Sequence, residues 1–255
     1  MEIKKDIKII DTHVHLGYDH VYDCENKIED IIDGMSANSI FKSLLIPFTN
    51  FYEQDVIKNH DLIFEACKVY KEMFYGVCCP NPHLSDDFVR DEIVRCIKVL
   101  GFVGIKLNTQ AHAVNPLSKD GKKIFKIAAD LEIPVMVHTG SGVPFSLPSL
   151  LIPIAEEFND LKVVILHSGQ YFSDESVLIA ERYSNIFLET TWTPVSVIGS
   201  FIKRLGSEKV MFGSDHIANI SVELKKYENL NLDFEDLKNC LEINAKKIFR
   251  LDLLN

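Results

Sequence analysis

The strongest constraint on the fold is an alternation of short apolar runs and helical stretches that repeats eight times. Each apolar run favours a β-strand, and a polar turn and a helical stretch follow it. Successive runs start 23 to 35 residues apart, close to the ~30 residues of a strand–helix–strand unit. The eight predicted strands are residues 8–15, 43–47, 75–79, 102–107, 134–138, 162–167, 186–190 and 209–215.

Apolar residues at helical spacing fill the intervals between these runs. Ser85 or Asp86 can cap one such stretch, because either side chain can accept a hydrogen bond from the first helical turn. Pro194 suits the first turn of another helix. His60 falls in a predicted helix, and we expect it at the surface. The expected helices are residues 29–36, 56–73, 86–100, 118–131, 150–158, 174–183, 194–205 and 234–249.

Alternating strands and helices favour a parallel sheet covered by helices. Eight units in 255 residues have the usual size of a closed (β/α)8 TIM barrel, and we expect one domain over residues 1–255. An open doubly wound sheet is the alternative, but it usually carries a glycine-rich phosphate loop after its first strand. Here the first run ends in Asp-Thr-His-Val-His-Leu-Gly instead.

Composition excludes several classes of protein. A hydrophobic share of 47% can bury a core, which excludes a disordered chain. The formal net charge of -10 opposes binding to nucleic acid, and no apolar stretch reaches the ~18–20 residues of a membrane span. The N-terminus shows no apolar signal segment, and the cysteines form no C-x-x-C pair. We therefore expect a cytoplasmic protein with reduced thiols.

Two histidines end the first predicted strand. His13 and His15 are two residues apart, so strand alternation points both imidazoles to the same side. We expect that side to be the barrel interior, with Ile10, Thr12 and Val14 facing the helices. Two inward imidazoles at the carboxyl end of a strand can bind one divalent metal ion. An isolated pair of this kind is equally compatible with two polar residues near a turn.

Further side chains of the metal-ligand type stand at the ends of other predicted strands. His138, His167 and Asp215 close the fifth, sixth and eighth apolar runs. Barrel active sites are built at the carboxyl ends of the strands. A single buried histidine is more often a core residue, but four imidazoles and a carboxylate at one rim favour a metal site.

These segments resemble the amidohydrolase superfamily and, more narrowly, its amidohydrolase-2 branch, which includes proteins similar to aminocarboxymuconate-semialdehyde decarboxylase. The motifs are D-T-H-V-H-L-G, G-I-K-L, V-H-T-G, L-H-S-G, G-S-D-H and the closing N-A-K-K-I-F, in the family's order and spacing. The resemblance implies a metal-dependent enzyme with a small-molecule substrate. We expect one divalent ion, Zn²⁺ first, while Mn²⁺, Fe²⁺ or Ni²⁺ suit the same nitrogen and oxygen donors. Self-association into a homo-oligomer stays open.

The resemblance assigns roles position by position. His13, His15, His138 and Asp215 match the family's metal ligands, and Asp215 also handles protons. His167 matches a histidine that lies near the metal as an acid/base or polarising group. The predicted catalytic residues are therefore Asp215 and His167.

Four residues are expected to bind substrate: Lys106, His112, Glu189 and Trp192. Lys106 lies in G-I-K-L, and we expect an unmodified cation that pairs with a substrate carboxylate beside a single metal ion. A carbamylated lysine that bridges two metal ions is one alternative, and a buried lysine paired with Glu189 or Asp215 is another. His112 follows the same strand, Glu189 lies on the seventh strand, and Trp192 is a candidate pocket wall.

Two reactions suit such a site. In hydrolysis, the metal lowers the pKa of bound water from about 15.7 towards ~7. Asp215 then takes the water proton while His167 polarises the carbonyl of an amide, ester or lactone. In the alternative, the metal orients a substrate carboxylate, and the site decarboxylates a small unsaturated or aromatic carboxylic acid without oxidation. The sequence analysis takes the hydrolase as its main prediction and a ligand-binding barrel without turnover as a third hypothesis.

Overall fold

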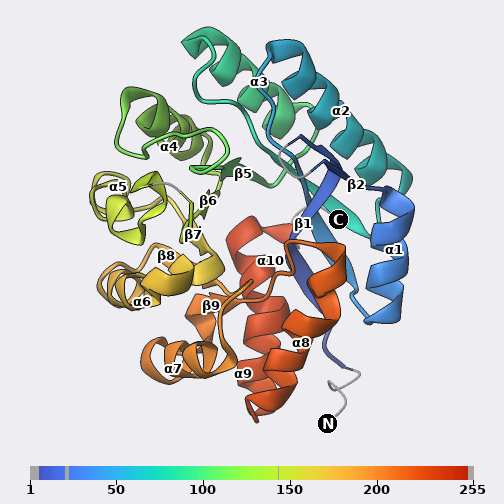
Figure 1. The fold of residues 1–255 in the computed structure, drawn as a ribbon, viewed down its shortest axis with the longest axis vertical. Coiled ribbons are helices and arrows are strands. Elements are labelled where there is room, and N and C mark those ends of the chain that lie inside the picture. The colour runs from blue at the N-terminus through green and yellow to red at the C-terminus, as the bar shows by residue number, and fades with distance from the viewer. Residues whose placement is uncertain (1–5, 21–22, 143, 252–255) are drawn as a thin grey trace.

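The computed structural model describes residues 6–20, 23–142 and 144–251, which form a (β/α)8 barrel (Figure 1). One sheet holds nine strands in the order β2-β1-β3-β4-β5-β6-β7-β8-β9. All neighbouring pairs are parallel except β1 and β2. The strands are β1 (Ile10–Asp19), β2 (Cys24–Asn26), β3 (Lys42–Pro47), β4 (Phe74–Cys78), β5 (Gly104–Leu107), β6 (Val135–His138), β7 (Val163–Leu166), β8 (Ile186–Glu189) and β9 (Val210–Met211). Each of the eight predicted strands is thereby confirmed.

The barrel closes between β1 and the segment that follows β9. Val14 forms a parallel bridge with Asp215. The Asp215 N–H donates to the His13 carbonyl at 2.6 Å, and the Thr12 N–H donates to the Phe212 carbonyl at 3.3 Å. These contacts confirm the predicted closed barrel over the open doubly wound sheet. They also bring Asp215 next to the histidines of β1.

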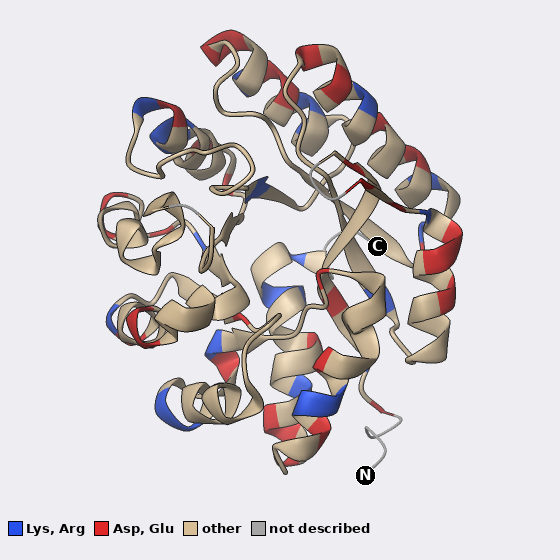
Figure 2. Cartoon of the chain, in the orientation of Figure 1, with Lys and Arg blue, Asp and Glu red and all other residues tan. Residues whose placement is uncertain are grey.

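Helices surround the sheet, and charged residues lie mainly along them (Figure 2). They are α1 (Ile28–Ala37), α2 (Glu53–Val69), α3 (Asp86–Lys98), α4 (Lys119–Leu131), α5 (Ile152–Glu157), α6 (Ser173–Arg182), α7 (Val195–Leu205), α8 (Ile220–Asn229), α9 (Phe234–Lys238) and α10 (Asn244–Phe249). Of the two predicted caps, Ser85 is the residue that caps α3, since its hydroxyl accepts from the Phe88 N–H. Pro194 is the N-cap residue of α7. The sequence analysis missed α8 and β2. Within the described residues, none of the helices is long and apolar enough to cross a membrane.

Ile10 faces the barrel interior, so its predicted position against the helices is wrong. It is 1% exposed and packs with the inner cluster that contains Leu44 and Met136, whereas Val14 packs with the helix-facing cluster. The pairing of β1 with β3 shifts by one residue between Asp11 and Val14. Such a bulge reverses the alternation of side chains, and the sequence pattern carries no sign of it.

His60 is buried in α2, so its predicted surface position is also wrong. Its Nδ1–H donates to Glu92 Oε1 at 2.6 Å, and its Nε2 accepts from the Cys79 N–H at 2.9 Å. Both ring nitrogens are therefore satisfied, as a buried imidazole requires. The side chain joins α2 to α3 and to the end of β4.

Candidate metal centre

The four predicted ligands and His167 stand at one end of the barrel. His13 and His15 lie on β1, His138 ends β6, His167 follows β7 directly, and Asp215 lies four residues beyond β9. Because the parallel strands all point the same way, their carboxyl ends form a single rim. The barrel thus places the five side chains at its mouth.

Three of these side chains bring donor atoms together in a triangle, which we call the donor triangle: His13 Nε2, His15 Nε2 and Asp215 Oδ1. The two nitrogens are 3.2 Å apart. The Asp215 oxygen lies 3.2 Å from His13 Nε2 and 3.4 Å from His15 Nε2. A tetrahedral ion with bonds of ~2.0–2.1 Å has neighbouring ligands about 3.3–3.4 Å apart. The donor triangle therefore has the size of one face of a metal coordination shell.

The electrostatics of the donor triangle favour the protonation states that a metal ion needs. Burial lowers the pKa of His13 and of His15 to about 3, which keeps both imidazoles neutral. Desolvation would raise the pKa of Asp215, but the interactions with His13, His167 and His15 hold it well below its usual value. Neutral imidazoles and an ionised carboxylate are the forms that ligate divalent cations.

His138 and His167 lie beside the donor triangle. The His167 ring centroid is 5.2 Å from that of His13 and 4.9 Å from that of His138. His138 Nε2 lies 3.4 Å from the Ser141 carbonyl oxygen. Among the described residues, the groups of three or more donor atoms within 4.8 Å of one another do not include His138. Of the four predicted ligands, three thus converge in the donor triangle, and the fourth, His138, lies next to His167 outside it.

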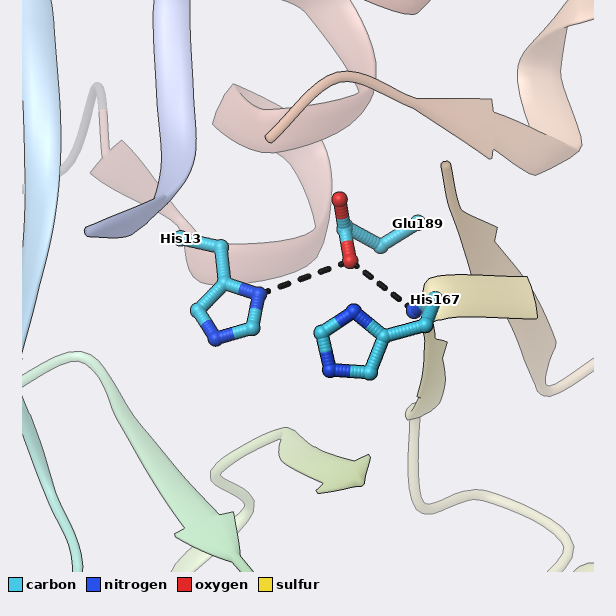
Figure 3. A group of neighbouring side chains, drawn as sticks. All are labelled: His13, His167 and Glu189. Carbon is cyan, nitrogen blue, oxygen red and sulfur yellow. Dashed lines mark hydrogen bonds and ion pairs between the residues drawn. The ribbon is translucent and has the colours of Figure 1, made fainter. Parts of the chain in front are cut away.

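The buried carboxylate of Glu189 contacts both His13 and His167 (Figure 3). Glu189 Oε2 lies 3.5 Å from His13 Nδ1 and accepts the His167 N–H at 3.1 Å. Glu189 Oε1 accepts the Thr191 N–H at 2.7 Å. A Cβ atom at Gly213 would lie 2.6 Å from Glu189 Oε1, so only glycine leaves room for this carboxylate. The sequence analysis placed Glu189 among the substrate-binding residues, but in the structure its oxygens face protein groups and it is 0% exposed.

Lys106 is a buried cation next to the donor triangle. Its side chain is on β5 and is 1% exposed, and its Nζ lies 3.1 Å from His13 Nε2. Burial lowers its pKa, while the charges of Asp215 and Glu189 oppose that change. Among the described residues it forms no ion pair with a carboxylate, so the predicted alternative of direct pairing with Glu189 or Asp215 is absent there.

The remaining two predicted substrate contacts differ in their relation to the donor triangle. The Trp192 indole N–H donates to Asp215 Oδ2 at 2.9 Å, and the side chain is half exposed. His112 is buried, with its pKa lowered to about 4 by desolvation. Both of its ring nitrogens lack a hydrogen-bond partner within the described ranges. Trp192 therefore contacts a candidate ligand, and His112 offers a neutral imidazole.

Asp11 is a supporting residue that the sequence analysis missed. Its Oδ1 accepts the N–H groups of His13 and Ser214, and its Oδ2 accepts the Ser214 hydroxyl at 2.6 Å. Desolvation raises its pKa to about 7. Asp11 joins β1 to the segment before Asp215. Its place in the D-T-H-V-H motif was the available signal.

Three residues that follow strand ends around the site have a left-handed backbone conformation. His167, Trp192 and Asp215 have φ angles of 59°, 63° and 65°. The left-handed region costs a non-glycine residue of the order of 1–3 kcal/mol and persists where the surroundings impose it, which is common at functional sites. The three residues follow β7, β8 and β9, so the strain follows the rim of the barrel.

A closed barrel with imidazole and carboxylate donors at the carboxyl ends of its strands defines a protein of the amidohydrolase type. The chain belongs to the Amidohydro_2 family, described as amidohydrolase, whose family model matches residues 52–251. This finding confirms the resemblance inferred from the motifs. The strand that carries His13 and His15 precedes the matched segment. No curated protein sequence matches the chain.

Several solved structures share the barrel. The 2,6-dihydroxybenzoate decarboxylase from Rhizobium is 15% identical with a TM-score of 0.78, covering 96% of this chain and 99% of that chain. The 5-carboxyvanillate decarboxylase from Novosphingobium aromaticivorans, complexed with manganese and 4-hydroxy-3-methoxy-5-nitrobenzoic acid, is 14% identical with a TM-score of 0.77, covering 97% of each chain. The 4-oxalomesaconate hydratase LigJ from Rhodopseudomonas palustris is 18% identical with a TM-score of 0.75, covering 96% and 97%. At these identities the likeness establishes the fold.

Proposed function

We propose that the protein is a metal-dependent, non-oxidative decarboxylase of a small aromatic or unsaturated carboxylic acid. The observation that carries the proposal is Lys106, a buried ammonium group 3.1 Å from His13 Nε2 that has no carboxylate ion-pair partner in the described part of the chain. A buried charge without a direct ion-pair partner is costly, and the charges of Asp215 and Glu189 offset the burial of Lys106 only in part. The carboxylate of a substrate would supply a direct partner beside the donor triangle.

The comparisons support decarboxylation over the hydrolysis that the sequence analysis put first. Two of the three similar structures described above are decarboxylases of aromatic carboxylic acids, and one of these holds manganese with a nitrobenzoic acid. The third is a hydratase. The fold alone does not determine the reaction, so the support lies in the agreement between these relatives and the buried Lys106 beside the donor triangle.

The donor triangle is the proposed metal site, with His13 Nε2, His15 Nε2 and Asp215 Oδ1 as the residues that would hold a divalent ion. Such an ion supplies positive charge that draws in and orients a carboxylate. Zinc, predicted from the sequence, and manganese, present in a similar structure, both suit nitrogen and oxygen donors. Metal analysis of the purified protein distinguishes them.

The protein's own groups then have to deliver one proton to the carbon that loses CO₂. When the bond between the ring or alkene carbon and the carboxylate breaks, CO₂ leaves and its bonding electron pair stays on the carbon, which takes up a proton. His167 stands at the rim with its Nδ1 buried and unpartnered within the described residues. His167 can relay this proton: as one ring nitrogen gives its proton to the carbon, the other takes one from water, so the imidazole stays neutral and the hydroxide left behind combines with the released CO₂ as bicarbonate. Lys106 holds the substrate carboxylate until the bond breaks.

The test is a screen of aromatic and unsaturated carboxylic acids with protein loaded with Zn²⁺ or Mn²⁺ in D₂O. We expect CO₂ release and one deuterium at the carbon that lost the carboxylate. A chelator should abolish the reaction, and the returned metal should restore it. Lactones, esters and amides belong in the same screen, because acid release without CO₂ would overturn the decarboxylase and restore the hydrolase.

A further inference from the structure

Trp192 contacts the oxygen of Asp215 that does not face the donor triangle. The indole N–H donates to Asp215 Oδ2 at 2.9 Å. The other oxygen, Oδ1, is the one that lies 3.2 and 3.4 Å from the Nε2 atoms of His13 and His15. A carboxylate with one oxygen engaged in this way presents its other oxygen alone to a cation.

The loop that carries Trp192 is itself held in place. Trp192 has a φ of 63°, a conformation that a bulky residue adopts only when its surroundings impose it. Its neighbour Thr193 donates its hydroxyl to the His167 carbonyl at 3.2 Å and its N–H to the Thr190 carbonyl at 3.0 Å. These bonds connect the loop to the rim on the β7 side.

A second anchor comes from α8. The Trp192 N–H donates to Glu223 Oε1 at 3.1 Å. Glu223 is 1% exposed, and both of its oxygens lie 2.7 Å from Lys226 Nζ. A buried carboxylate paired in this way has little freedom to move. The contacts therefore run from α8 through the Trp192 backbone and indole to Asp215.

The Trp192 side chain is unusually exposed for a tryptophan. Trp192 is 50% exposed, although tryptophan is usually largely buried. Its indole N–H donates to Asp215 Oδ2. A pocket wall would explain the exposed ring, but it would not explain the bond to a candidate ligand.

We propose that Trp192 is a positioning residue for Asp215 and that Glu223 positions Trp192. The indole N–H orients the Asp215 carboxylate so that Oδ1 alone is available to the metal. Outer partners of this kind typically contribute 10–100-fold to metal affinity. The inference rests on the metal centre of the proposed function.

The first experiment measures Mn²⁺ affinity, by the electron paramagnetic resonance signal of free Mn²⁺. Trp192→Phe keeps an aromatic ring and removes the N–H donor, and we expect ~10–100-fold weaker binding than in the wild type. The control is Tyr171→Phe, because Tyr171 is an aromatic residue after β7 that is 92% exposed. We expect its Mn²⁺ affinity to equal that of the wild type.

The second experiment uses fluorescence, since Trp192 is the only tryptophan of the chain. Titration with Zn²⁺, which is diamagnetic, should change the indole emission and saturate at one equivalent, because the ion polarises the carboxylate that accepts the indole N–H. Glu223→Ala should weaken Zn²⁺ binding and alter the emission before metal is added. Glu223→Gln keeps an oxygen acceptor for the Trp192 N–H and should restore both properties towards the wild type.

The outcomes separate this inference from the proposed function. Metal binding by the wild type with equal affinity in Trp192→Phe would overturn the positioning role and leave the metal centre standing. Unchanged emission on stoichiometric Zn²⁺ binding would do the same. A wild-type protein that binds neither ion would overturn the metal centre, and the inference with it.

Discussion

Glu189 Oε2 lies 3.5 Å from His13 Nδ1, on the side of the imidazole opposite the nitrogen that faces the donor triangle. A metal-binding histidine is commonly oriented by such a carboxylate, which accepts the second ring N–H and fixes the tautomer. The same oxygen accepts the backbone N–H of His167. One buried carboxylate therefore lies against the imidazole of a candidate ligand and holds the backbone of a candidate acid.

Glu189→Gln tests this relationship. The amide keeps the size of the side chain but removes the charge, so we expect metal affinity or turnover to fall by ~10–100-fold. Metal content after dialysis and the rate on the substrate found in the screen are the two measurements. Wild-type values for both would contradict the positioning role of Glu189.

His167→Ala should separate metal binding from chemistry. His167 lies beside the donor triangle, so the variant should keep most of its metal while turnover falls by ~10²–10⁴-fold, the range for a lost acid–base or oxyanion partner. Asp215→Ala should lower both metal content and rate, because Asp215 Oδ1 belongs to the donor triangle. If His167→Ala loses metal as completely as His13→Ala does, His167 is a ligand.

Lys106→Met should weaken the binding of carboxylate substrates. Methionine has a similar length without the charge, so the substrate carboxylate would lose its cationic partner while the pocket stays filled. We expect KM to rise by at least ~10-fold, with a fall in kcat if Lys106 also holds the carboxylate during bond cleavage. Steady-state kinetics at saturating metal measures the two effects, and an unchanged KM would remove Lys106 from substrate binding.

Much of the fold and of the site could be predicted because, in a barrel, the spacing of strands along the sequence indicates where each strand end lies in space. Strands whose starts lie 23 to 35 residues apart, with a helix between them, favour parallel neighbours, so metal-ligand residues that end several of these runs come to the same rim. The bulge that turned Ile10 inwards depends on pairing with β3 and leaves no local pattern. Glu189 and Trp192 were singled out as residues, but their partners depend on side-chain directions that spacing does not specify.

The buried pair of His60 and Glu92 lies outside the site and leads to a prediction about stability and pH. Desolvation opposes the ionisation of Glu92, but hydrogen bonds from Arg95 and His60 outweigh it and lower its pKa to about 2. Because this pKa is below that of the unfolded chain, the unfolded state binds the proton first as pH falls. The stabilisation is therefore complete above about pH 4.5 and is lost between about pH 4.5 and pH 2.

Glu92→Gln should remove this contribution. We expect the free energy of unfolding to fall by about 1–3 kcal/mol near pH 7, because the His60 Nδ1–H and the Arg95 guanidinium lose their charged acceptor. The difference from the wild type should shrink as pH falls below about 4.5. Asp61→Asn is the matched control, since Asp61 also contacts Arg95 but is exposed, and its effect should stay within ~0.5 kcal/mol. Urea unfolding across this pH range measures all three proteins, and a difference that persists unchanged down to pH 3 would show that the ionised Glu92 is not the source of the stabilisation.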